Sequence, residues 1–141
     1  MVKFAPFTCE DFGRLGPLAE YGAYIPDGLA SALEGSNAWS LWVGDRIVAC
    51  CGTIEVWKNR HAAWAYFSTT SGKYMARATR FTSRYILPAA HGRIEAIVRA
   101  DFAAGNRWLK LLGFAVENPP GILTAYGPDG SDYISYVLHN Q

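Results

Sequence analysis

The sequence predicts an α/β fold with a mixed, mostly antiparallel sheet of about seven strands and helices on both faces. Three β-rich runs follow one another between residues 38 and 68, joined by short polar turns, which is typical of an antiparallel meander. The middle run, residues 46–57, is apolar on both faces, so each face should be covered. Beyond residue 70, helical and strand patterns alternate, which indicates a βαβ crossover and one parallel pair. A length of 141 residues predicts one domain, residues 1–141.

The N-terminal elements are short. VKFAPF, residues 2–7, alternates weakly and predicts a first strand. Thr8 is a helix-capping residue and is followed by two acidic residues, so a short helix should begin there. A second helix should open near Pro26, with Leu29 and Leu33 four residues apart on one face, and the polar EGSN closes it. The meander then follows as strands at residues 38–43, 46–57 and 62–68.

The segment from residue 71 to 87 has the cleanest helical periodicity, and Pro88 should end it. Two stripes run along this predicted helix at steps of three and four residues. The apolar stripe, predicted to be buried, is Tyr74, Ala78, Phe81 and Tyr85, and the basic stripe is Lys73, Arg77, Arg80 and Arg84.

The C-terminal part alternates. Residues 93–101 predict a strand, and AAGNRWLKLL predicts a helix that ends at Gly113. Trp108, Leu111 and Leu112 should form the buried face of that helix. FAVE then predicts a strand, and LTAY and DYISYVLH predict a closing hairpin around the turn at residues 127–130.

Composition excludes several function classes. The formal net charge of +1 gives no global field that would recruit nucleic acid, and no recognised nucleic-acid motif is present. No apolar run approaches the roughly 18 residues of a membrane span, and the N-terminus lacks a signal-peptide pattern, so we expect a cytoplasmic protein. Cys9, Cys50 and Cys51 lack metal-ligand spacing, which predicts buried reduced thiols and no metal site.

The element order and one local stretch resemble the GNAT superfamily of acyl-CoA-dependent N-acyltransferases. The stretch is EAIVRADFAAGNRWLKLLGFAVE, residues 95–117, in which Asn106 matches the family's asparagine and Gly113 and Phe114 match its glycine-aromatic pair. The resemblance covers most of the chain. It is nearest in character to short GNAT-like proteins encoded by tailed bacteriophages, including an internal virion protein.

The resemblance implies acetyl-CoA as co-substrate. Family members hold its pyrophosphate with backbone N–H groups in a glycine-containing loop before a helix. The matching loop here keeps one glycine, Gly72. If Gly72 is the first glycine of the pattern, Thr69 replaces Gln or Arg and Tyr74 replaces the second glycine; if it is the second, Phe67 and Thr70 are the mismatched positions. Backbone groups of residues 66–68 are expected to pair with the pantetheine arm. The implied cofactor-binding residues are Phe67, Ser68, Thr69, Gly72, Lys73 and Asn106.

The resemblance also defines the groups needed for proton transfer. The position that many members fill with a tyrosine, which protonates the departing thiolate, holds Leu109 here. Tyr66 and Tyr74 are the alternative acids. Glu55, on the predicted long strand, and Glu95 are the candidate general bases, and a raised pKa would suit either to the role.

Two surfaces have more than one interpretation. The basic stripe is a solvated helix face, a contact for CoA phosphates through Lys73, or a docking face for an acidic host or virion protein. The loop of residues 21–26, YGAYIP, is an ordinary aromatic loop or the acceptor side of the site. The closing hairpin could pair with a second copy of the chain and so form a homodimer.

Two functions of different class remain open. The leading prediction is a phage-type GNAT acyltransferase that moves an acetyl group from acetyl-CoA to an amine, on a host or virion protein. The alternative is a catalytically inactive GNAT-like protein that acts as a virion component or binds and modulates a host protein. Leu109 and the degenerate loop favour the alternative.

Overall fold

The computed structural model describes residues 1–20 and 23–140, and within them the strands form one eight-stranded sheet. The order across the sheet is β1-β2-β3-β4-β5-β8-β6, and β7 also pairs with β8. Neighbours are antiparallel except β4 and β5, so the predicted mixed sheet is confirmed. The strands are β1 (Val2–Pro6), β2 (Asn37–Val43), β3 (Arg46–Trp57), β4 (Arg60–Phe67), β5 (Gly92–Arg99), β6 (Ala115–Val116), β7 (Ile122–Leu123) and β8 (Tyr133–Asn140).

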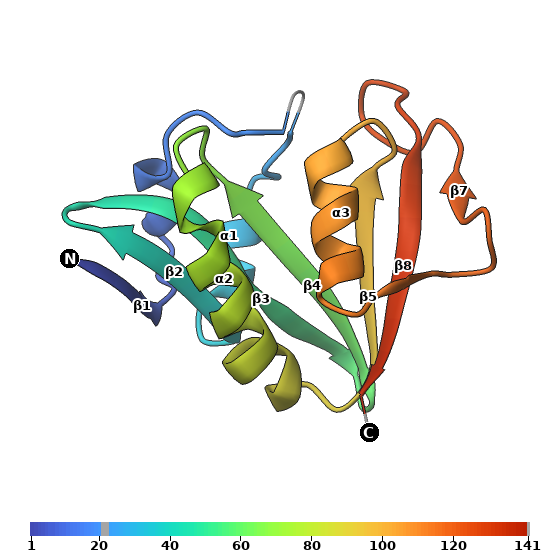
Figure 1. Cartoon of the computed structure of the whole chain (residues 1–141), viewed down its shortest axis with the longest axis horizontal. Helices are drawn as coiled ribbons and strands as arrows, with labels where there is room; N and C mark the ends of the chain where they lie inside the picture. The colour runs from blue at the N-terminus through green and yellow to red at the C-terminus, as the bar shows by residue number, and fades with distance from the viewer. Residues whose placement is uncertain (21–22, 141) are drawn as a thin grey trace.

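Helices cover both faces of the sheet, as predicted. The helices α2 (Met75–Phe81) and α3 (Ala103–Leu111) lie on one face, and α1 (Leu29–Leu33) lies on the other (Figure 1). Residues 47–53 of β3 are buried throughout because packing covers both of its faces. No described helix is long and apolar enough to cross a membrane.

The predicted long helix at 71–87 changes its winding along its length. A 3-10 turn (Gly72–Tyr74) leads into α2, which continues as a π turn (Thr82–Ile86) and a second 3-10 turn (Leu87–Ala89). The π turn holds more residues per turn and therefore shifts the phase of the stripe. The prediction that Tyr85 is buried is wrong: its exposed fraction is 56%, and Thr82 and Ile86 are buried instead.

Two other predicted elements differ in detail. The helix expected from Thr8 is a 3-10 turn at Asp11–Arg14. The buried Asp11 side chain accepts hydrogen bonds from the backbone and hydroxyl of Thr8 and from Ser40, and so fixes this turn against β2. The first strand of the closing hairpin is only the two residues of β7 and begins earlier than LTAY.

The α3 helix ends at Gly113, as predicted, where a φ of +102° gives the left-handed conformation that glycine adopts freely. Its buried face differs from the prediction, because Leu111 has an exposed fraction of 71%. Leu109 packs with Leu112 and the buried Phe114 in its place.

The parallel pair β4–β5 is short, and this opens the sheet. Only Arg60–Ala62 pair with Arg93–Glu95, and beyond these residues the two strands diverge (Figure 1). Glu95 holds the closed end together by accepting from Arg60 Nε at 2.8 Å and Arg93 Nε at 2.6 Å. The sheet is therefore split over the remaining length of β4 and β5.

Candidate active site

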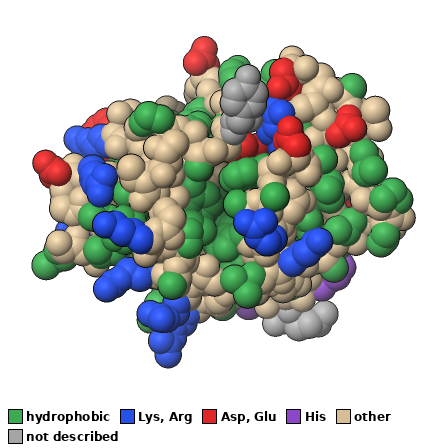
Figure 2. Space-filling model, turned by 45° about the horizontal axis from the view of Figure 1, so that its top comes forward, with side chains coloured by type: hydrophobic (Ala, Val, Ile, Leu, Met, Phe, Trp, Pro, Cys, Tyr) green, Lys and Arg blue, Asp and Glu red, His purple; other side chains and the backbone are tan. Residues whose placement is uncertain are grey.

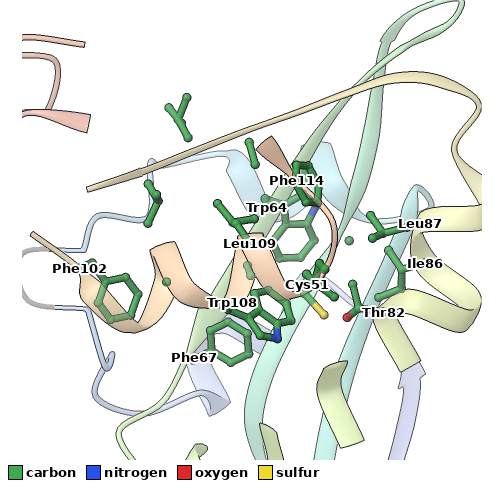
Figure 3. Close-up of a pocket in the computed structure, with 18 of the residues that line it drawn as sticks. Cys51, Trp64, Phe67, Thr82, Ile86, Leu87, Phe102, Trp108, Leu109 and Phe114 are labelled. Atoms are coloured by element: carbon green, nitrogen blue, oxygen red, sulfur yellow. The ribbon is translucent and has the colours of Figure 1, made fainter. Parts of the chain in front are cut away.

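The split between β4 and β5 opens on both faces of the sheet. On the α2–α3 face it forms a small apolar cavity of about 100 Å³, whose lining includes Phe67, Ala96, Trp108 and Leu109 (Figure 3). On the opposite face it forms a groove of about 370 Å³. The cavity and the groove share five lining residues, so they meet at the split. These residues are Glu20, Ala63, Trp64, Ala65 and Ile97.

Glu20 reaches this junction because the segment before it pairs with β4. The Ala19 N–H donates to the Phe67 carbonyl oxygen at 2.8 Å, and the Thr69 N–H donates to the Pro17 carbonyl oxygen at 3.0 Å. The first bond occupies the Phe67 carbonyl oxygen, which belongs to residues 66–68, the stretch predicted to pair with the pantetheine arm, and the second lies one residue beyond that stretch. The same pairing carries Glu20 into the split.

Burial and neighbouring charges shift the pKa of the Glu20 carboxyl group. Burial raises its pKa, and repulsion by Asp101 adds to this, while attraction from Arg99 opposes it. A half-buried carboxyl with a raised pKa at the meeting point of two cavities suits a general base. The sequence reasoning missed Glu20. Its position directly before the predicted acceptor loop, residues 21–26, could have indicated it. Tyr21 and Gly22 of that loop lie outside the described residues.

Tyr66, a predicted catalytic residue, lies on the groove side of the junction. Its hydroxyl donates to the Tyr24 carbonyl oxygen at 3.0 Å and so ties the acceptor loop to β4. Burial raises the pKa of Tyr66, and nearby Glu20 and Tyr133 raise it further, so the hydroxyl keeps its proton near neutral pH. Trp64, two residues before it, carries a buried Nε1–H with no partner among the described residues.

The two carboxylates proposed from the sequence lie at the closed end of the split. Glu55 is exposed near the end of β3, opposite His61, and is absent from the linings of the cavity and the groove. Burial raises the pKa of Glu95, but hydrogen bonds from Arg93 and Arg60 outweigh it and leave the pKa lowered. The structure therefore brings neither carboxylate to the junction where it places Glu20 and Tyr66.

The predicted pyrophosphate loop has two backbone N–H groups without acceptors. Within it, Thr70 donates to Ser68 Oγ at 3.2 Å and Ser71 donates to the Ser68 carbonyl oxygen at 3.1 Å. Among the described residues, no acceptor is hydrogen-bonded to the backbone N–H of Gly72 or Lys73. The exposed Lys73 side chain extends over the Tyr74 ring, with Nζ 5.5 Å from its centroid. Within the described residues, this turn therefore presents two free backbone N–H groups and the Lys73 ammonium.

Asn106 is fully engaged within the protein. Its Nδ2 donates to the carbonyl oxygens of Arg99 at 3.0 Å and Phe102 at 2.8 Å, and its Oδ1 accepts from the Tyr136 hydroxyl at 2.6 Å. The side chain thus joins the start of α3 to β5 and β8. Both amide hydrogens are used, so a ligand would have to displace one of these bonds.

Trp108 joins the two helices across the cavity. Its Nε1 donates to Thr79 Oγ1 on α2 at 2.8 Å, and its ring packs edge-on against Phe67 with centroids 5.0 Å apart. Leu109 lines the same cavity and supplies no proton donor (Figure 3). The cavity on the α2–α3 side is therefore apolar, and the Trp108–Thr79 hydrogen bond joins the two helices across it.

The basic stripe divides into two parts. Lys73 lies at the pyrophosphate turn, whereas Arg77, Arg80 and Arg84 are exposed and line a separate hollow of about 310 Å³ together with Lys3 of β1. Lys and Arg side chains gather over the left of the molecule, and acidic side chains gather at its upper right (Figure 2).

The cysteines differ from the prediction at one position, because Cys9 is exposed. Cys50 and Cys51 are buried, and burial raises the pKa of each thiol to about 12. Among the described residues, no group of His, Cys, Asp or Glu side chains could hold a metal ion.

Comparison with solved structures identifies the fold. The chain is similar to Ard1 from Thermoplasma volcanium, with a TM-score of 0.77 at 13% identity over 99% of this chain and 98% of that one. It is similar to the ribosomal-protein-S18-alanine N-acetyltransferase from Escherichia coli, with a TM-score of 0.70 at 14% identity over 98% and 93% of the chains. It also resembles the NatC complex bound to Gag peptide and CoA, with a TM-score of 0.66 at 12% identity over 99% of both chains. These similarities show the GNAT acetyltransferase fold.

No family model matches the sequence. No curated protein matches it either.

Proposed function

We propose that this protein is an acetyl-CoA-dependent N-acetyltransferase. One observation supports this most directly: at the split between β4 and β5, the cavity on one face and the groove on the other share lining residues, and Glu20 is one of them. A transfer between two substrates needs such a junction, because each must reach the same atom from its own side. CoA is bound in one similar structure, the NatC complex.

The residues at the junction suit the chemistry of acetyl transfer. The thioester would enter from the α2–α3 side, and the amine would enter from the groove. Glu20 removes a proton from the attacking ammonium, and its raised pKa brings its affinity for a proton closer to that of the substrate. Tyr66 keeps its proton, and to protonate the departing thiolate its hydroxyl would have to leave the Tyr24 carbonyl oxygen and reach the split from the groove side.

The turn at residues 68–73 is the proposed pyrophosphate site. The N–H groups of Gly72 and Lys73 have no acceptors among the described residues, and the Lys73 ammonium adds a positive charge. Phe67, Ser68 and Thr69 lead into this turn from β4. Asn106 remains a proposed contact for the pantetheine arm. To make that contact, its side chain would have to give up one of its present hydrogen bonds.

A second function is a GNAT-fold protein that binds a partner without catalysis. The basic hollow beside β1 favours it, because Arg77, Arg80 and Arg84 are exposed there and make no ion pair with a described residue. An acidic host or virion protein fits that charge. The phage resemblance, the homodimer and the virion location stay predictions from the sequence.

Acetyl-CoA binding separates the two functions. We expect millimolar acetyl-CoA to raise the melting temperature by mass action, and CoA release in the presence of an amine to report turnover. Desulfo-CoA is a useful companion ligand because it keeps the pyrophosphate but carries no thioester. If neither ligand changes the melting temperature, the acetyltransferase function is contradicted and the binding function remains.

A further inference from the structure

The groove on the acceptor side has one ionisable carboxylate and no basic side chain among its described lining residues. Glu20 lies at its inner end, and most other lining side chains are apolar or aromatic. Pockets of this kind select a ligand by the few polar groups that they contain. The described lining therefore offers a charged partner to a cation and no charged partner to an anion.

The aromatic side chains of the groove are unusually exposed at its rim. Tyr24 and Tyr126 have exposed fractions of 60% and 56%, and the Tyr126 ring packs against Tyr133 with centroids 5.6 Å apart. Trp64 and Tyr66 lie deeper on β4. Exposed aromatic faces bind apolar groups and attract cations, so an amine on an aromatic or aliphatic body gains from both effects.

Arg99, a cation that influences Glu20, is not available to a ligand. Its guanidinium is buried and donates to both Asp101 carboxylate oxygens, at 3.0 and 3.2 Å, and to Asp129 Oδ2 at 2.8 Å. The carboxylates of Glu20, Asp101 and Asp129 therefore outnumber the single Arg99 guanidinium beside the groove. A substrate carboxylate near the amine would meet net negative charge, and no described lining residue carries a positive charge to pair with it.

From this we propose that the acceptor is a primary amine on an aromatic or bulky apolar body, with no acidic group beside the amine. The inference rests on the proposed acetyltransferase function. In the transfer, the amine nitrogen bonds to the acetyl carbon and the carbon–sulfur bond breaks. CoA leaves as its thiol, and the net proton lost from the ammonium passes through Glu20 to solvent.

Three amines with the same aromatic body test the proposal. They are 2-phenylethylamine, phenylalanine and phenylalaninamide, and they differ in the group beside the amine. We expect kcat/KM for 2-phenylethylamine to exceed that for phenylalanine by about tenfold or more, and phenylalaninamide to recover most of the difference. Equal or better use of phenylalanine would overturn the proposal.

Binding without acetyl-CoA keeps this test separate from that of the proposed function. The dissociation constants of the three amines, measured by calorimetry, should follow the same order. If acetyl-CoA fails to bind while the amines keep this order, the acetyltransferase function is contradicted, but the assignment of the groove as an amine-binding site is supported. If acetyl-CoA binds and turns over another amine while these three bind equally, the groove assignment falls.

A matched pair of tyrosines locates the binding surface. Tyr126 and Tyr85 have the same exposed fraction, 56%, but only Tyr126 lines the groove. Tyr126→Ala should weaken 2-phenylethylamine binding about fivefold or more, and Tyr85→Ala should leave it unchanged. Equal effects of both variants, or no effect of Tyr126→Ala, would contradict the assignment.

Discussion

The two openings of the split sheet differ in what they contain. The cavity between α2 and α3 is small and apolar, and the Trp108–Thr79 hydrogen bond bridges its walls. The groove on the other face is wider and holds tyrosines, and Glu20 lies where it meets the cavity. The resemblance to GNAT sequences concerns the first opening, where Leu109 stands in place of a tyrosine, and the turn before α2, where Thr69 and Tyr74 depart from the pattern. The ionisable groups that suit catalysis belong to the junction and the second opening.

The largest expected effect concerns the two candidate bases. Glu20→Gln should lower kcat by about 100-fold or more, because it removes a positioned base while keeping the shape of the side chain. Acetyl-CoA should still raise the melting temperature. Glu55→Gln, at the closed end of the split, is the matched control and should change kcat little. The reverse ranking in a CoA-release assay would place the base at Glu55.

The raised pKa of Glu20 predicts a pH signature in both rate and stability. The base acts when deprotonated, so kcat should rise as the pH passes through the Glu20 pKa. The Glu20→Gln variant should not show this rise in its pH–rate profile. The Glu20 pKa is higher in the folded protein than in the unfolded chain, so the ionised carboxylate lowers the free energy of unfolding at high pH. This destabilisation disappears below the unfolded pKa of about 4.3, where both states are protonated. Glu20→Gln should therefore melt higher than the wild type at pH 8, with a difference that shrinks toward pH 4.

Asn106 should affect stability through its three hydrogen bonds. Asn106→Ala leaves the Tyr136 hydroxyl, on a residue with an exposed fraction of 1%, without its acceptor, and should cost about 2 kcal/mol in free energy of unfolding. Tyr136→Phe removes the same bond without leaving an orphaned hydroxyl and should cost less in urea titrations. Unchanged stability together with lost acetyl-CoA binding would instead support the contact with the pantetheine arm.

The sequence predicted what local patterns and family resemblance determine. The meander, the end of α3 at Gly113 and the mixed sheet follow from periodicity, turn residues and element order. The position of Glu20 does not, because it depends on the pairing of Ala19 with Phe67, 48 positions along the chain. The burial of Tyr85 was predicted wrongly because the helix contains a π turn at Thr82–Ile86, which regular periodicity does not anticipate.

Lys73 tests whether the pyrophosphate turn works despite its degenerate pattern. Lys73→Glu should weaken acetyl-CoA binding about tenfold, and the loss should shrink as salt rises, because the side chain is exposed and its field is screened. Arg84→Glu makes the same charge change in the separate basic hollow and should have little effect. Equal losses in calorimetric titrations would mean that the whole basic face contributes through its charge.

The smallest expected effect concerns the bridge over the cavity. Thr79→Val keeps the side-chain shape but removes the acceptor of Trp108 Nε1, which should lower the free energy of unfolding by about 1 kcal/mol. If the pantetheine arm enters between α2 and α3, binding must break this bond, so the variant should bind acetyl-CoA about fivefold more tightly. Lower stability with tighter binding would show that the bridge opposes cofactor entry. Lower stability with unchanged affinity would mean that the helices stay joined when acetyl-CoA binds.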